Sequence, residues 1–285
     1  MRDETFMRVM RLLPRSALSR AAGSIARAKV PAPVHRALMR GFARAFEIDM
    51  GEAELGFEGY PTLADFFARK LKPGRRTVEG GERVVSSPVD GAISQLGYVK
   101  SGQCVQAKGI EYPIGKLLGD EAAAHAPLAK FEGGAFATLY LSPRDYHRIH
   151  APLGGRILGY SYIPGEFWPV NRHSVRALEA VFCLNERLVT YLDTPAGLLA
   201  LVAVGATCVS RIRASYDEAI VTHAGEPARA HRYDPPIPIR KGEEVGRFEM
   251  GSTVILLFEA GRVRWADGLG PEAVVRMGMR LGELT

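Results

Sequence analysis

The sequence of 285 residues contains few cysteines and no long uncharged apolar run. The cysteines, Cys104, Cys183 and Cys208, are scattered and form no Cys-x-x-Cys pair, so neither a disulfide framework nor a zinc site is indicated. The longest apolar stretch, residues 197–209, is shorter than the roughly 20 residues that a membrane-spanning helix needs. Early acidic residues and interspersed arginines are unlike a signal peptide. We therefore expect a cytoplasmic protein without a transmembrane helix.

Acidic side chains are scarce in the N-terminal segment. The whole chain carries a net charge of +6, whereas residues 1–45 alone carry +8, ten basic side chains less Asp3 and Glu4. Such an asymmetry indicates an anionic partner, either nucleic acid or an anionic membrane surface. With 47% hydrophobic residues the chain can bury a sizeable core, and its length allows one or two domains.

Residues 4–46 are expected to form short helices broken at Pro14 and at Pro31 and Pro33. In the last of these helices, arginines occupy one face and bulky apolar residues recur every four positions on another: Val34, Leu38, Phe42 and Phe46. Basic helices with such a stripe can lie in the interfacial plane of an anionic bilayer. The alternative is an ordinary helical subdomain packed on the core. The density of arginines favours the membrane.

The remainder of the chain has the pattern of a β-rich body. Thr62 is expected to cap a short helix that ends at Pro73 and Gly74. From about residue 82, short apolar runs alternate with Gly, Pro and Asp turns, which predicts strands at 84–85, 92–96, 135–141, 188–192, 198–204 and 254–258. Residues 175–181 are expected to form a helix. The predicted fold is α+β: a helical N-terminal region, 1–59, followed by a mostly antiparallel β body, 60–285.

Three segments of this body could carry chemistry. Asp90 precedes Gly91 at the mouth of a strand, although Asp-Gly alone is a turn signal. The segment LSPRDYHRIHAP, residues 141–152, brings together Asp145, Tyr146, His147 and His150, and only a bend would let residue 150 converge with 145 and 147. No ligand cluster accompanies the two histidines, so no metal is expected. Phe167 and Trp168 could form the apolar wall of a lipid pocket or fill the core.

The fourth segment is KGEEVGRFEMGSTVILLFE, residues 241–259, in which Ser252 stands at the edge of a buried strand. Gly251 precedes it and permits backbone conformations closed to other residues. The serine hydroxyl could attack the carbonyl of its own preceding peptide bond, although Gly-Ser-Thr beside a strand is also a common bulge or turn. Asp90, His150 and Ser252 are also compatible with a serine hydrolase or esterase, but Ser252 lacks a G-x-S-x-G context.

The segments FFARKLKPGRR, SPVDGAI, LSPRDYHRIHAPLGG, PGEFWPVN, NERLV, VAVGATCV and KGEEVGRFEMGSTVILLFEAGRV resemble, in order, segments of the phosphatidylserine decarboxylases. The similarity covers roughly residues 60–265. YHRIH and Gly-Ser-Thr are its most specific parts. The sequence departs from the family's pattern at Ser210 and Arg211, where the family more often has Gly-Ser, and in the tail after Trp265.

The resemblance implies that the chain cleaves itself between Gly251 and Ser252, giving chains 1–251 and 252–285 that stay together as a heterodimer. It implies that Ser252 becomes a covalent pyruvoyl (pyruvate) cofactor and forms a Schiff base with phosphatidylserine, which is decarboxylated to phosphatidylethanolamine. The implied roles are a base made by Asp90 and His150 with assistance from Asp145, proton donation by His147, and a substrate pocket at Phe167, Trp168 and Tyr146.

The resemblance also implies a peripheral position on the cytoplasmic face of the cell membrane, bound to anionic phospholipid. Self-association is left open. An RNA-binding module is the remaining alternative, but the sequence has no aromatic RNP-like motif and its positive charge is confined to one end.

Overall fold

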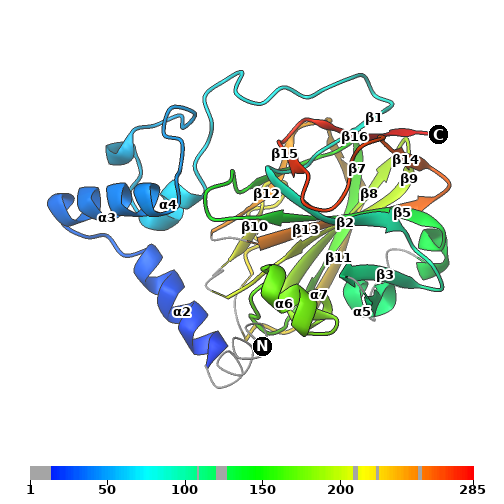
Figure 1. Ribbon diagram of the computed structural model, residues 1–285, viewed down its shortest axis with the longest axis horizontal. Helices are drawn as coiled ribbons and strands as arrows, with labels where there is room; N and C mark the ends of the chain where they lie inside the picture. Colours follow the sequence, from blue (N-terminus) through cyan, green and yellow to red (C-terminus); the bar gives the residue numbers. More distant parts are fainter. Residues whose placement is uncertain (1–13, 108, 120–126, 208–210, 223–224, 250–251) are drawn as a thin grey trace.

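The computed structural model describes residues 14–107, 109–119, 127–207, 211–222, 225–249 and 252–285. Two N-terminal helices, α2 (Arg15–Ala26) and α3 (Ala32–Ala45), stand to one side of a β-rich body (Figure 1). The short elements η1 (Phe57–Gly59) and α4 (Leu63–Phe67) connect them to that body. The predicted α+β fold is confirmed. The segment expected to form the first helix, residues 4–13, lies outside the described residues.

The helix α3 packs through a face that differs from the predicted apolar stripe. Met39 and Ala43 are buried in a small core together with Tyr60 and Phe66. This core takes residues from both sides of the predicted boundary at 59 and 60, and the division into domains stays a prediction.

The stripe itself remains largely exposed. Val34 is 55% exposed and Leu38 and Phe46 are each 39% exposed, while Phe42 is half-buried. Within the described residues, no helix combines the length and the apolar character needed to cross a lipid bilayer.

The body is built on an antiparallel sheet of eight strands. Their order is β11 (Arg229–Ile239), β7 (Gly155–Ile163), β8 (Arg187–Thr194), β9 (Gly197–Val204), β13 (Ser252–Ala260), β5 (Gly134–Leu141), β2 (Gly91–Tyr98) and β15 (Val274–Val275). The inner strands β8, β9, β13 and β5 are buried along nearly their whole length, so they carry continuous apolar runs rather than an alternating pattern. The strands predicted at 135–141, 188–192, 198–204 and 254–258 are confirmed.

Smaller sheets and short helices pack around the large sheet. In Figure 1, α5 (Ile114–Leu118), α6 (Arg172–Ala177) and α7 (Val181–Leu184) lie on one side of it with the hairpin β3 (Gln103–Ala107) and β4 (Ile110–Pro113). A sheet of β1 (Val84–Ser86), β16 (Arg280–Leu284) and β14 (Val263–Trp265) lies towards the other side. The third small sheet, β10 (Ile212–Ala214), β12 (Glu244–Phe248) and β6 (Arg148–His150), leads into the segment that precedes Ser252. One further short helix, η3 (Leu128–Phe131), precedes β5.

Two predicted helix boundaries are wrong. The helix expected at 175–181 starts earlier, because the Asn171 side chain accepts a hydrogen bond from Ser174 N–H (3.1 Å) and caps α6. It ends at Ala177, and Ala180 adopts a left-handed conformation that separates α6 from α7. The cap predicted at Thr62 is confirmed, since its Oγ1 accepts from Asp65 N–H (3.2 Å), but α4 ends at Phe67, before Pro73.

The turn at Gly91 places Asp90 at the start of β2. Gly91 has φ of +154°, and a Cβ there would lie 2.2 Å from the carbonyl oxygen of Tyr140. Only glycine fits so close to the neighbouring strand. Gly91 therefore fixes the position of the preceding residue, Asp90, at the start of β2.

Candidate active site

Ser252 stands at the edge of a buried strand, as the sequence predicts: it is the first residue of β13, which lies between β5 and β9. It pairs with Leu141 and is 1% exposed. Its hydroxyl has no hydrogen-bond partner among the described residues. Buried hydroxyls nearly always have a partner, so this one needs an explanation. Gly251, the residue whose carbonyl it is predicted to attack, lies outside the described residues.

A cavity of about 310 Å³ opens at Ser252. Its walls are mainly apolar and come from both parts of the molecule: Phe42 of α3 and Phe46 directly after it, Phe67 of α4, and Leu141 and Val170 of the body. We refer to it as the serine pocket. The exposed stripe of α3 ends at this pocket, because Phe46 belongs to both.

The aromatic residues predicted to line a substrate pocket do not line the serine pocket. Phe167 is buried, and the Trp168 ring lies beneath the guanidinium of Arg15, 3.5 Å from its ring centroid. The backbone of Trp168 is fixed by two hydrogen bonds to the Asn185 side chain, each 2.8 Å. The next residues of the segment, 169–171, line the serine pocket instead. A role for Phe167 and Trp168 in binding substrate stays a prediction.

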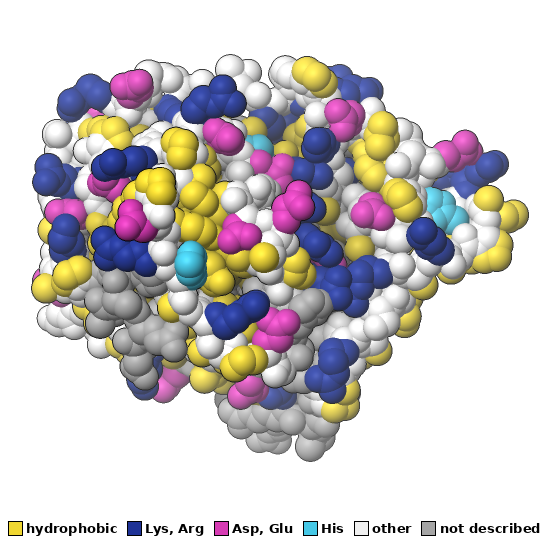
Figure 2. Space-filling view, turned by 180° about the vertical axis from the view of Figure 1, so that it is seen from behind, with side chains coloured by type: hydrophobic (Ala, Val, Ile, Leu, Met, Phe, Trp, Pro, Cys, Tyr) yellow, Lys and Arg dark blue, Asp and Glu magenta, His cyan; other side chains and the backbone are white. Residues whose placement is uncertain are grey.

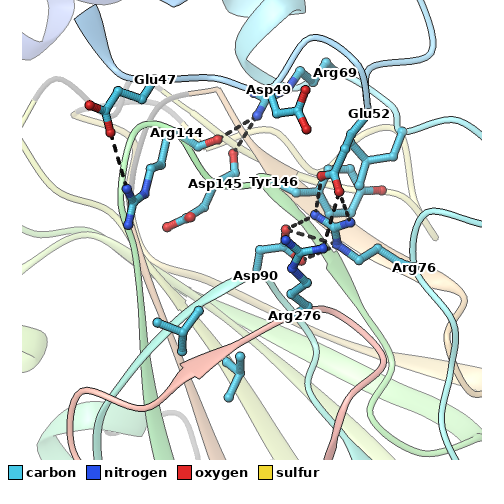
Figure 3. A pocket seen from close by; sticks show the side chains of 13 residues that line it. Glu47, Asp49, Glu52, Arg69, Arg76, Asp90, Arg144, Asp145, Tyr146 and Arg276 are labelled. Atoms are coloured by element: carbon cyan, nitrogen blue, oxygen red, sulfur yellow. Dashed lines mark hydrogen bonds and ion pairs between the residues drawn. The ribbon is translucent and has the colours of Figure 1, made fainter.

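Asp90 lies in a separate, charged cavity of about 220 Å³ that we call the acidic pocket (Figure 3). Arg76 Nε donates to both of its carboxylate oxygens, at 2.8 and 3.1 Å, and Met277 N–H donates to Oδ1 at 2.8 Å. The same guanidinium binds Glu52 through two hydrogen bonds of 3.1 and 2.8 Å. Arg76 therefore joins Asp90 to the segment that follows the N-terminal helices.

His150, at the end of β6, is held by two hydrogen bonds. Its Nδ1–H donates to Gly242 O (2.8 Å), so in the neutral ring Nε2 accepts from the hydroxyl of Tyr146 (3.0 Å). Burial lowers the pKa of His150. Tyr146 lines the acidic pocket together with Asp90. Its hydrogen bond to His150 therefore brings Asp90 and His150, which are predicted to form the base, into one region. The described hydrogen bonds of Asp90 nevertheless go to Arg76 and Met277, not to His150.

His147 is completely buried and makes different contacts. Its Nε2–H donates to Ser142 O (3.0 Å), and its ring stacks on Phe67 with centroids 4.0 Å apart. Nδ1 has no partner among the described residues. Burial, and then the charge of Arg69, lower the pKa of His147 to about 3. Because Phe67 also lines the serine pocket, His147 stands directly behind that pocket's wall.

Asp145 closes the turn between β5 and β6. Its Oδ2 accepts from Ser142 N–H (2.7 Å) and from Ser142 Oγ (2.8 Å), and burial raises the pKa of this carboxyl. In an extended segment, residue 150 would face away from residues 145 and 147. The turn at Asp145 supplies the bend that lets them converge. It holds Asp145 at the acidic pocket and His147 behind Phe67.

The low pKa of His147 predicts a pH dependence of stability. In the unfolded chain this imidazole binds a proton as the pH falls through about 6.5, whereas in the folded protein it does so only near pH 3. Folding is therefore disfavoured progressively below pH 6.5, by about 2 kcal/mol at pH 5, and is unaffected above it. Chemical denaturation from pH 7 to pH 5 is expected to show a smaller loss of stability in His147→Gln than in the wild type. Equal losses would contradict the buried, neutral state of His147.

Sequence reasoning missed several residues of these pockets. The segment FFARKLKPGRR, residues 66–76, contains three of them: Phe67, Arg69 and Arg76. This segment resembles the family, but no residue pattern within it indicates a catalytic role. Glu52 reaches Arg76 across 24 positions of sequence, a contact that no local pattern encodes. The two histidines face different partners, and the described residues contain no group of three or more His, Cys, Asp or Glu side chains arranged to hold a metal ion.

Comparisons of the sequence with known proteins identify its family. The family model described as phosphatidylserine decarboxylase matches residues 63–283. A phosphatidylserine decarboxylase proenzyme of Myxococcus xanthus is 62% identical over 285 residues, covering 100% of both chains. Proteins with the same name from Anaeromyxobacter sp. and Azotobacter vinelandii are 55% and 43% identical, each over 99% of both chains. This chain belongs to the phosphatidylserine decarboxylase family of enzymes.

Proposed function

We propose that this chain cleaves itself between Gly251 and Ser252, converts Ser252 into a pyruvoyl group, and then decarboxylates phosphatidylserine to phosphatidylethanolamine. The observation that carries the proposal is the buried hydroxyl of Ser252 at an apolar pocket, which has no hydrogen-bond partner in the part of the chain that the structure describes. A hydroxyl that a neighbouring strand or side chain already held would have to break that bond before it could attack. The word proenzyme in the names of the relatives agrees with a processed chain.

In the first stage, Ser252 Oγ forms a bond to the Gly251 carbonyl carbon and the peptide C–N bond breaks, which leaves an ester. Elimination breaks the Cβ–Oγ bond and frees the Gly251 carboxylate, and hydrolysis with loss of ammonia gives the ketone. His150 is the proposed base. Its low pKa keeps the ring neutral and able to accept a proton. Asp90 stabilises the charge that develops on it, and Asp145 assists.

The topology supports a heterodimer that survives the cut. Residues 252–285 supply β13, which is hydrogen-bonded to β5 on one side and to β9 on the other. They also supply β15, paired with β2, and β16, paired with β1. Breaking one peptide bond before β13 leaves all of these pairings intact. The two chains therefore stay together without a covalent link.

In the second stage, a pyruvoyl group at position 252 supplies an electron sink for the bond that loses carbon dioxide. Ser252, Phe42, Phe46 and Phe67 surround the space in which it and the lipid head group would lie. The apolar walls exclude water. We assign to His147 the transfer of the proton that replaces the lost carboxylate. The neutral ring holds its own proton on Nε2, which donates to Ser142 O, so Nδ1, without a partner among the described residues, is the atom that would take up a proton during turnover and pass it on.

A position on the membrane surface suits the same geometry. On the helical extension that appears at the right of Figure 2, Lys and Arg side chains alternate with hydrophobic ones. Besides the stripe on α3, Leu18 and Ile25 of α2 are 41% and 67% exposed. Apolar side chains that enter the interface beside arginines bind anionic bilayers. The serine pocket would then open where its lipid substrate lies, on the cytoplasmic face of the membrane.

Intact mass spectrometry of the purified, active protein tests the proposal. We expect two species that together account for 31.1 kDa apart from the small change at residue 252, the lighter one beginning with a pyruvoyl group. A serine hydrolase that uses Ser252, His150 and Asp90 without cleavage would give a single chain. Active decarboxylase in which every molecule is uncut, with an unmodified serine at 252, would overturn the proposal.

A further inference from the structure

Three arginines and one glutamate form a cluster directly before the predicted cleavage site. Glu249 is 7% exposed, and its Oε1 accepts from Arg213 Nε (2.7 Å) while Oε2 accepts from Arg27 Nη1 (3.3 Å). Glu249 N–H donates to the carbonyl of Arg211 (3.0 Å), and the Arg211 guanidinium lies near enough to the Glu249 carboxylate for that charge to raise its pKa. The cluster thus joins the C-terminal end of α2 to β10 and to the end of β12.

The cluster carries more positive charge than its carboxylates neutralise. Glu249 pairs with Arg27 and Arg213, and the next carboxylate, Glu226, pairs with Arg229. No ion pair of Arg211 occurs among the described residues, and its Nε is buried without a partner. Burial lowers the pKa of Arg211, and the charge of Arg27 lowers it further against the opposing effect of Glu249. An anion beside Arg211 would relieve both unfavourable contributions.

The position of the cluster identifies the kind of anion. Glu249 lies three residues before Ser252, so the two Cα atoms are at most about 11 Å apart. Arg211, just before β10, follows four positions after Thr207, which lines the serine pocket with Ala206. In a phosphoserine head group, only two carbons and an ester oxygen separate the amine from the phosphorus. A lipid with its amine at residue 252 can therefore bring its phosphate to a nearby arginine.

We propose that Arg211, supported by Arg27 and Arg213, binds the phosphodiester of the lipid head group. Arginine presents several N–H donors in a planar fork that matches phosphate oxygens, which gives both charge and orientation. The site would set the distance between the phosphate and residue 252, so that the amine of a serine lipid reaches the reacting position. This inference depends on the proposed function and goes beyond it by naming a specificity-determining residue.

The test uses the full-length, processed protein and a short-chain phosphatidylserine kept below its micellar concentration. For Arg211→Ala we expect normal cleavage, a KM raised about tenfold and a kcat changed little, because the phosphate contact is made equally in the ground and transition states. Arg211→Lys, which keeps the charge, should recover most of the loss. Arg232→Ala is the matched control, since Arg232 is exposed on β11 and none of the described hydrogen bonds or ion pairs joins it to the cluster. Inorganic phosphate should inhibit the wild type competitively and Arg211→Ala less.

A second arm distinguishes the substrate's phosphate from other phosphates of the bilayer. Binding to phosphatidylglycerol vesicles should be nearly equal in the wild type and in Arg211→Ala. If vesicle binding fell while the KM for the soluble substrate stayed unchanged, the cluster would bind the membrane surface and the inference would be wrong. An unchanged KM and unchanged vesicle binding would also overturn it. Neither result would touch the proposed function, which fails only if the wild type is uncut or does not decarboxylate.

Discussion

Replacing Ser252 by alanine is expected to leave the chain as one polypeptide of 31.1 kDa and to reduce decarboxylation below detection. The hydroxyl of Ser252 is the proposed nucleophile for cleavage, and the carbon atoms of the same residue become the pyruvoyl group. A single change therefore prevents both self-cleavage and decarboxylation. No residual decarboxylation is expected, because the pyruvoyl group is made from Ser252 itself. Denaturing electrophoresis and a carbon dioxide release assay on the same sample measure the two effects together.

The folded structure should tolerate this substitution. The hydroxyl of Ser252 is buried and makes no hydrogen bond within the described residues, and removing an unsatisfied polar group relieves a desolvation cost instead of breaking a hydrogen bond. The thermal midpoint of Ser252→Ala is therefore expected to equal or exceed that of an uncut wild-type chain. Loss of activity would then report chemistry and not unfolding.

Ser161→Ala is the matched control. Ser161 is completely buried in β7, and its hydroxyl also lacks a described partner, but it lies on a strand separated from β13 by β8 and β9. The Ser161→Ala variant should cleave itself and decarboxylate phosphatidylserine like the wild type. A Ser252→Ala protein that is still cut, or that is uncut but active, would refute the assignment of this residue.

The position of Ser252 could be predicted from the sequence because local chemistry determines it. A short, dense run of β-branched and aliphatic residues, 254–258, favours a buried strand, and Gly251 with Ser252 marks where it begins. The cap at Thr62 follows from an equally local interaction. The start of α6 also follows from a local interaction, the Asn171 cap, whereas α4 and α6 end at Phe67 and Ala177, where no proline or glycine marks a boundary.

The electrostatic partners of the site lie beyond the reach of sequence patterns. The pair Asp90-Gly91 at the mouth of a strand indicates a candidate residue, and the resemblance gives it a role, but neither predicts its ion pair with Arg76 or the further link to Glu52, which join different parts of the chain. The bend at Asp145 was recognised as necessary. Its direction, which places His147 behind Phe67 and His150 beside Tyr146, depends on tertiary packing. Phe167 and Trp168 illustrate the same limit, because an apolar segment does not reveal which of its residues face a cavity.

Replacing His147 by alanine is expected to give a protein that is cut and carries the pyruvoyl group, with kcat reduced by about 10²- to 10⁴-fold, the usual contribution of a positioned acid or base. Cleavage is assigned to His150, whose hydrogen bonds to Gly242 and Tyr146 do not involve residue 147. Intact mass measures the first effect, and carbon dioxide release at saturating lipid measures the second. His231→Ala, which changes an exposed histidine on β11, is the control and should behave like the wild type.

The two buried histidines can be separated because their environments differ. Among the described residues, Nδ1 of His147 has no partner behind the wall of the serine pocket, whereas both ring nitrogens of His150 are hydrogen-bonded beside the acidic pocket. His150→Ala is accordingly expected to remain uncut. If His147→Ala were uncut and His150→Ala were cut but inactive, the two roles would be exchanged. If both were cut and active, Phe67 and Tyr146 would hold these rings for structural reasons alone, and the proton would have to come from another group.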